Sequence, residues 1–106
     1  MSVDSIYGTL NLLILRTLDG GPAHGLAIKD SIAAATRGEL DVEVGALYPA
    51  LHRLQRDGHL SAEWGRSDKG RRAKIYSLTE KGRRNLESEI ERWRRHVSSI
   101  EAVVGS

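Results

Sequence analysis

Residues 44–60 combine a helical pattern of apolar positions with a basic end and a sharp stop. The opposite face of this helix is small at its start and basic further on, because it carries Gly45, Ala46, Pro49, Arg53 and Arg56. Asp57-Gly58 ends the helix, since glycine readily takes the left-handed conformation of a helix end. The apolar stripe follows spacings of three and four residues through Val44, Leu47, Tyr48, Leu51 and Leu54.

This helix has two interpretations. A small, basic face that precedes a hairpin is typical of a helix that reads a DNA groove, whereas exposed arginines also occur on any ordinary core helix. Pro49 lies about one turn inside the helix, where it removes a backbone hydrogen bond. We therefore expect a local distortion there or a later helix start.

Two further helices are predicted before it. The first spans about residues 6–18, with Asp4 or Ser5 as a cap, and Leu12 and Leu15 make it apolar on more than one side. Such a helix must be covered on several sides, either by a deep core or by a partner subunit. The second helix spans about 24–36, and a short extended piece at 40–42 separates it from residues 44–56. Two helices joined by a brief connection indicate a helix-turn-helix.

A hairpin follows. Residues 60–64 alternate as a half-buried strand does, and residues 73–78 form the expected partner strand, with Tyr76 and Leu78 pointing inward. The loop at 65–72 holds four basic residues and one acid. It is either a solvated hairpin tip or a segment that lies along a phosphate backbone.

The last helix carries a heptad seam. Thr79 is its expected N-cap, and the helix reaches about 37 Å at ~1.5 Å per residue. Because a domain of this size is only ~26 Å across, part of the seam must overhang and needs a partner, although its first half could pack on the first helix of its own chain. The seam consists of Leu86, Ile90, Trp93, Val97, Ile100 and Val104.

Composition places the chain among single-domain globular proteins. It has 106 residues, 40% of them hydrophobic, and no cysteine, so neither a disulfide framework nor a thiolate metal site is available. The longest near-apolar run, Leu12–Leu15, is too short to span a bilayer, and the N-terminus has no secretory signal pattern. We expect a soluble, cytoplasmic protein with no membrane partner.

The net charge of +2 conceals a strong asymmetry along the chain. Residues 1–43 hold three basic and six acidic side chains, whereas residues 53–84 hold ten basic and four acidic ones. Residues 85–106 hold three and four. Positive charge clustered on the third helix and the hairpin favours a polyanion as partner.

The spacing of the histidines and acidic residues does not indicate an active site or a metal site. An enzyme needs a nucleophile, a base and an electrostatic stabiliser brought together, but the histidines have no paired acid at helical or hairpin spacing. We predict no enzyme activity, no catalytic residues and no cofactor. A histidine and carboxylate metal sensor stays open only as an alternative without matching ligand spacing. The histidines are His24, His52, His59 and His96.

Several motifs follow one another along the chain: Pro22-x-His24-Gly25, Leu47-Tyr48-Pro49-Ala50-Leu51-x-Arg53-Leu54, Asp57-Gly58 and Arg71-Arg72-x-Lys74-x-Tyr76-x-Leu78-Thr79-x-x-Gly82. In this order they resemble the PadR family of bacterial transcriptional regulators. The likeness runs from about Gly8 to the end of the chain. Because the chain stops after one long helix, it is similar to the short subfamily.

The resemblance implies a fold that is mainly α with a β-hairpin wing (α+β), a winged helix-turn-helix plus a long C-terminal dimerisation helix. Residues 1–78 would form the DNA-binding part and residues 79–106 the dimerisation helix of the same compact unit. The implied function is a double-stranded DNA-binding regulator, a homodimeric repressor on a near-palindromic operator. A winged-helix adaptor that binds protein instead of DNA is the alternative.

The resemblance also implies sites. A small aromatic or cationic effector would bind at the dimer interface beside Trp93 and Val97. The implied dimer interface comprises Leu86, Ile90, Trp93, Val97 and Ile100. The implied DNA contacts are Gly45, Ala46, Tyr48, Arg53, Arg71, Arg72 and Lys74.

Overall fold

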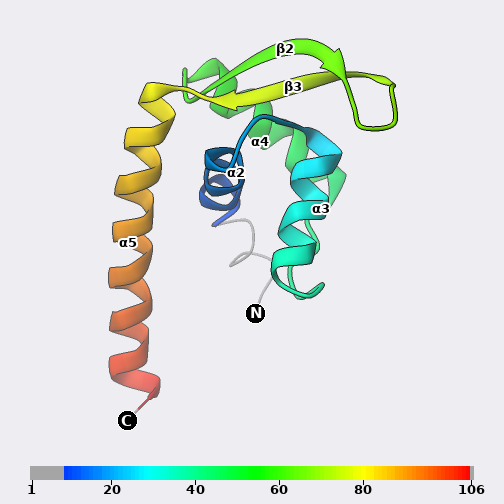
Figure 1. The fold of residues 1–106 in the computed structure, drawn as a ribbon. Coiled ribbons are helices and arrows are strands. Elements are labelled where there is room, and N and C mark those ends of the chain that lie inside the picture. Colours follow the sequence, from blue (N-terminus) through cyan, green and yellow to red (C-terminus); the bar gives the residue numbers. More distant parts are fainter. Residues whose placement is uncertain (1–8, 106) are drawn as a thin grey trace.

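The computed structural model describes residues 9–105, which form helices and one small antiparallel sheet (Figure 1). The expected α+β class, with a hairpin wing and a long last helix, is confirmed. The expected cap at Asp4 or Ser5 lies outside the described residues. In chain order the elements are α2 (Leu10–Asp19), β1 (Ala23–His24), α3 (Gly25–Ala35), α4 (Val44–Arg56), β2 (Leu60–Arg66), β3 (Arg72–Leu78) and α5 (Glu80–Val104).

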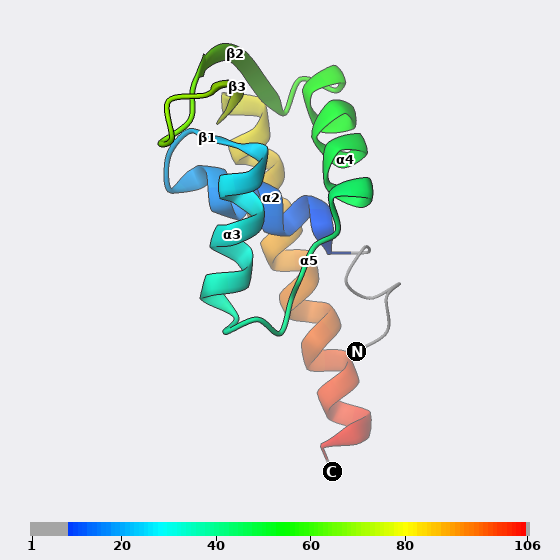
Figure 2. The same cartoon turned by 90° about the vertical axis from the view of Figure 1, so that its right-hand side faces the viewer.

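Helix α2 lies at the centre of the molecule. It contacts α3, α4, α5 and β3, and in both views it sits between α5 and the other helices (Figures 1 and 2). Ile14 and Leu15 are fully buried, so the apolar character of this helix on more than one side reflects a deep core position. Leu12 and Leu13 stay partly exposed on the side toward α5.

The core is built entirely from apolar side chains and one tyrosine. No polar or charged residue among those described is buried except Tyr76. Every element except β1 supplies at least one buried core side chain, so one continuous core joins the helices and the sheet. Its members are Leu10, Ile14, Leu15, Leu18, Ile28, Ile32, Val42, Leu47, Ala50, Leu51, Leu54, Leu60, Tyr76 and Leu86.

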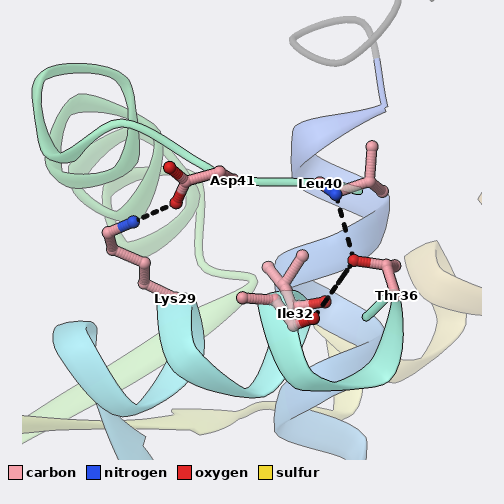
Figure 3. A network of polar contacts seen from close by, with 6 residues as sticks. Lys29, Ile32, Thr36, Leu40 and Asp41 are labelled. Atoms are coloured by element: carbon pink, nitrogen blue, oxygen red, sulfur yellow. Dashed lines mark hydrogen bonds and ion pairs between the residues drawn. The ribbon is translucent and has the colours of Figure 1, made fainter. Parts of the chain in front are cut away.

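Side chains at both ends hold the connection between α3 and α4 in place (Figure 3). The Thr36 hydroxyl donates to the Ile32 carbonyl at 2.9 Å and accepts from the Leu40 amide at 3.0 Å. The Lys29 ammonium pairs with the Asp41 carboxylate. Residues 40–42, the expected extended piece, form neither helix nor strand, and these contacts hold them just before the start of α4.

Helix α4 begins and ends where the sequence predicts, at Val44 and Arg56. Pro49 lies inside it, so the alternative of a later start is wrong. The inclusion of Val44 in the apolar stripe is also wrong, because Val44 is 45% exposed. The buried face is centred on Leu47 and Leu54, and helical spacing places Val44 at its margin.

The sheet has three antiparallel strands in the order β1-β3-β2. Strand β1 was not expected, because a two-residue strand shows no sequence pattern. The hairpin register pairs Ala62 with Tyr76 and Leu60 with Leu78. Tyr76 is buried and Leu78 half-buried, as the inward orientation requires. The strands are longer than predicted, so the hairpin tip narrows to residues 67–71.

Helix α5 begins directly after the sheet, as predicted, with Thr79 as its cap. The Thr79 hydroxyl donates to the Gly58 carbonyl at 2.7 Å and accepts from the Gly82 amide at 3.0 Å. Gly58 has a φ of +82°, which is the left-handed conformation expected after α4. Over its 25 residues α5 extends well past the other elements (Figure 1), in a molecule measuring 51 × 29 × 21 Å.

None of the helices within residues 9–105 is both long enough and apolar enough to cross a bilayer.

We predict that Gly82→Ala destabilises the fold by about 2–3 kcal/mol, because a Cβ there would collide with the His59 backbone carbonyl, which cannot move freely. Urea unfolding measures the loss. Gly45→Ala is the matched control, since nothing lies within 4 Å of its Cβ position. It should be neutral or stabilising by up to about 1 kcal/mol. Equal stability of the Gly82 variant and the wild type would contradict the prediction.

Candidate nucleic-acid interface

A cleft of about 550 Å³ opens between the hairpin, the start of α3 and the middle of α4. Four residues expected to contact DNA line it together: Tyr48, Arg71, Arg72 and Lys74. Tyr48 comes from α4, Arg71 from the hairpin tip, and Arg72 and Lys74 from β3, so strand β2 separates the first from the others in sequence. The fold thus places the expected DNA contacts of the hairpin beside the expected contact on α4.

Tyr48 and Gly25 fit closely at the floor of this cleft. A Cβ on Gly25 would lie 2.7 Å from the Tyr48 hydroxyl oxygen and 2.8 Å from its ring. Only glycine leaves room for the tyrosine against the first turn of α3. Gly25 and Tyr48, which belong to two different motifs, are therefore coupled by packing. This packing determines the position of the Tyr48 side chain in the cleft.

His24 links α3 to the hairpin tip. Its Nδ1 accepts a hydrogen bond from the Ala27 amide at 3.3 Å and so caps α3. Its Nε2 lies 3.5 Å from a carboxylate oxygen of Asp68 in the tip. Sequence reasoning had placed residue 24 inside the helix. The histidine in the Pro22-x-His24-Gly25 motif was the available signal for a cap.

The inner face of the hairpin stacks cations over aromatic rings. The guanidinium carbon of Arg72 lies 4.4 Å from the ring centroid of Trp64, and the Lys74 ammonium lies 5.8 Å from that of Tyr76. Burial raises the pKa of the Tyr76 phenol, and nearby Tyr48 adds to that shift. The buried phenol therefore stays neutral beneath the lysine.

The other expected contacts lie beside the cleft and not in it. Gly45 and Arg53 are exposed on α4, and Ala46 is half-buried. By helical spacing they belong to the outer side of α4, next to His52, which does line the cleft. His52 follows Tyr48 by one helical turn, and this spacing is the sequence signal for its place in the lining of the cleft.

Cations outnumber acids along the cleft. Lys69, Arg71, Arg72 and Lys74 face two carboxylates, those of Asp30 and Asp68. Trp64 and Leu26 add exposed apolar surface, at 63% and 49%. The sequence pattern did not single out Trp64 as part of the site, because its exposure depends on where the hairpin leaves the core. The cleft suits an anionic partner with flat or apolar parts.

A second hollow, of about 670 Å³, lies between α2 and α5. Trp93 lines it, but Val97, the other expected effector residue, lies outside its lining. Leu40 from the connection between α3 and α4 forms part of the wall. The complete lining is Thr9, Leu12, Leu13, Arg16, Leu40, Glu87, Ile90, Trp93 and Arg94.

The apolar seam of α5 divides into two parts. Leu86 is buried in the core of its own chain, so it has almost no surface left for a partner. Ile90 packs at the edge of that core. Beyond it, Trp93 is 44% exposed, Val97 is half-buried, and Ile100 is exposed. The surface available to a partner therefore begins at Ile90.

Within residues 9–105, no group of three or more His, Asp or Glu side chains stands where it could hold a metal ion.

The helix pair α3–α4, followed by a hairpin that shares a cleft with α4, defines a winged helix-turn-helix protein. Residues 14–88 match the family model described as the transcriptional regulator PadR-like family. The chain belongs to this family of transcriptional regulators.

Solved structures agree with this assignment. The chain is similar to a transcriptional regulator from Clostridium thermocellum, with 26% identity, a TM-score of 0.89 and 98% of each chain covered. It also resembles a PadR-like transcription factor from Bacteroides fragilis, with 32% identity, a TM-score of 0.75 and 95% of each chain covered. A PadR family regulator from Eggerthella lenta matches at 28% identity and a TM-score of 0.82, over 96% of this chain and 87% of that one.

Proposed function

We propose that the protein is a sequence-specific repressor that binds double-stranded DNA as a homodimer. The observation that carries the proposal is the cleft shared by α4 and the hairpin, in which Tyr48, Arg71, Arg72 and Lys74 converge. Residues 1–78 would bind DNA and residues 79–106 would join the two subunits. Repression, as opposed to activation, rests on the family resemblance alone.

In the proposed complex, α4 enters the major groove and the hairpin follows the adjacent backbone. The outer side of α4 carries Gly45 and Ala46, whose small size lets the helix backbone approach the bases closely. Arg53 and His52 stand further along the same helix as candidate base or phosphate contacts. Arg71, Arg72 and Lys74 are placed to neutralise phosphates.

A homodimer joined through α5 would suit the proposed complex with DNA. The seam from Ile90 to Ile100 projects beyond the rest of the chain, and a second copy of α5 would cover it. A two-fold dimer presents two copies of α4 to the same face of a duplex. The operator should accordingly be a near-palindrome with half-sites about one or two helical turns apart.

We predict that binding to duplex DNA depends steeply on salt. If the dimer neutralises about six phosphates, log affinity should fall against log salt with a slope near −5. Arg71→Ala should make the slope shallower by about 0.9 for each contacting subunit. Fluorescence anisotropy with a labelled duplex over a range of salt concentrations measures both values.

The matched control is Arg84→Ala, which removes the same charge from an exposed site on α5 outside the cleft. Its slope should equal that of the wild type. Binding that ignores salt, or no preference for DNA upstream of the protein's own gene over a random duplex, would favour the adaptor function instead.

We predict that Val97→Asp gives monomers, because the substitution puts an unpaired charge in the seam. Sedimentation velocity measures the change in mass. Ser99→Asp is the control, since it adds the same charge to an exposed position on another side of α5 and should leave a dimer. A Val97 variant that stays dimeric at micromolar concentration would place the subunit contact elsewhere.

We further propose that a flat apolar or cationic molecule binds in the hollow beside Trp93 and releases the repressor from DNA. The indole offers a stacking surface, and Glu87 gives the wall an acidic group for a cation. The ligand acts as an effector only if it favours one arrangement of the two DNA-binding parts over another. The competing explanation is that the indoles of both subunits fill the interface.

Titration with planar dyes should quench tryptophan fluorescence in the wild type and not in Trp93→Leu, whose remaining emission comes from Trp64. Quenching that survives in the variant would place the ligand elsewhere. An absence of quenching with every compound would leave Trp93 as packing alone.

A further inference from the structure

We infer that Trp64 is a positioning residue for DNA binding: its indole holds the Arg72 guanidinium in the cleft, ready for a backbone phosphate. The inference rests on the proposed function and adds to it a residue that neither the charge pattern nor the motifs single out. The stack between the two side chains, at 4.4 Å from guanidinium carbon to ring centroid, is its basis.

The hairpin register explains how the pair forms. Trp64 faces Lys74 across the ladder and Arg72 faces Arg66, so Trp64 and Arg72 are diagonal neighbours on one face of the sheet. Diagonal neighbours are within reach of each other when one is aromatic and the other is long. The ring therefore extends under Arg72, toward the hairpin tip.

Packing in the core does not account for this tryptophan. The apolar part of the same sheet face ends with Ala62 and Tyr76, and Trp64 stands beyond it with 63% of its surface exposed. Tryptophan side chains in folded proteins are well buried on average. Here the face of the ring contacts the Arg72 guanidinium, and both side chains line the cleft.

The two arginines at the end of the hairpin are held differently. Arg66 donates to the Gly70 carbonyl at 3.0 Å and so belongs to the turn. In the described part of the chain, the Arg72 side chain has no hydrogen bond or ion pair, and it contacts the ring of Trp64. Stacking leaves the edge of a guanidinium free to donate two parallel hydrogen bonds to a phosphate.

Holding Arg72 in advance lowers the entropy lost on binding, because a long side chain otherwise has to be ordered when the complex forms. A saving of this kind corresponds to about fivefold in affinity for each subunit on the DNA. The contribution to the salt slope comes from the charge of Arg72 and not from the ring.

The test compares Trp64→Leu, Trp64→Phe, Arg72→Ala and the double variant Trp64→Leu/Arg72→Ala on a random-sequence duplex of about 30 base pairs (~3 helical turns, long enough for both subunits). We expect Trp64→Leu to weaken binding about fivefold for each contacting subunit with an unchanged salt slope. Trp64→Phe, which keeps a ring face, should restore most of the affinity. In the Arg72→Ala background the leucine substitution should have no further effect.

Two measurements separate positioning from folding. Thermal unfolding should show equal stability for Trp64→Leu and the wild type. In the NMR spectrum of the free protein, the Arg72 Nε–H resonance should carry a ring-current shift in the wild type that disappears in Trp64→Leu. A loss of fold would not give this combination, and a direct contact of the ring with DNA is tested by the double variant.

A wild type that binds no duplex at low salt would overturn the proposed function. A wild type that binds, with a leucine effect that persists undiminished in the Arg72→Ala background, would overturn the present inference alone, because Trp64 would then contact the DNA itself. Equal affinity of Trp64→Leu and the wild type would overturn it as well.

Discussion

The structure depends on the burial of α2. This helix must hide apolar side chains on several sides, and it does so by separating α5 from the helix-turn-helix and the sheet. Ile14 and Leu15 have no exposed surface, so the elements around them cannot move independently without opening a cavity, which costs about 2–5 kcal/mol for a lost large side chain. The C-terminal end of α2 is tied to α5 as well, since Asp19 pairs with Arg83.

This central helix would give a physical route between the proposed effector site and the proposed DNA interface. The hollow beside Trp93 is bounded by α2, by α5 and by Leu40. The Leu40 amide is held by Thr36, at the end of α3, and the connection that follows leads directly into α4 (Figure 3). A ligand that alters the spacing of α2 and α5 would therefore press on the segment that positions α4. Because packed cores switch between discrete arrangements, such a shift can be passed on as a rotation of whole elements.

The sequence predicts the helices, which have a repeating apolar pattern or a recognisable cap. It misses the parts of the structure that depend on how the strands pair. The bounds of α4 follow from its apolar spacing and the stop at Gly58, and α5 follows from Thr79 and the seam. Strand β1 has only two residues, so its pairing with Tyr76 leaves no pattern to detect. The candidate site divides in the same way. The charge pattern selects Arg71, Arg72 and Lys74, whereas the packing of Tyr48 on Gly25 and the stack of Arg72 on Trp64 join residues that are distant in sequence or on different strands.

The two parts of the proposed DNA interface have different physical characters. The outer side of α4 is nearly free of charge until Arg53, so it offers shape and close backbone approach more than attraction. The hairpin supplies the cations, and it places two of them, Arg72 and Lys74, over aromatic rings at its inner face. Asp30 and Asp68 in the same cleft offset part of this charge. In the proposed complex, affinity from the hairpin would depend on where each cation is held as well as on the net charge, because the carboxylates weaken the attraction of the cleft as a whole for phosphate.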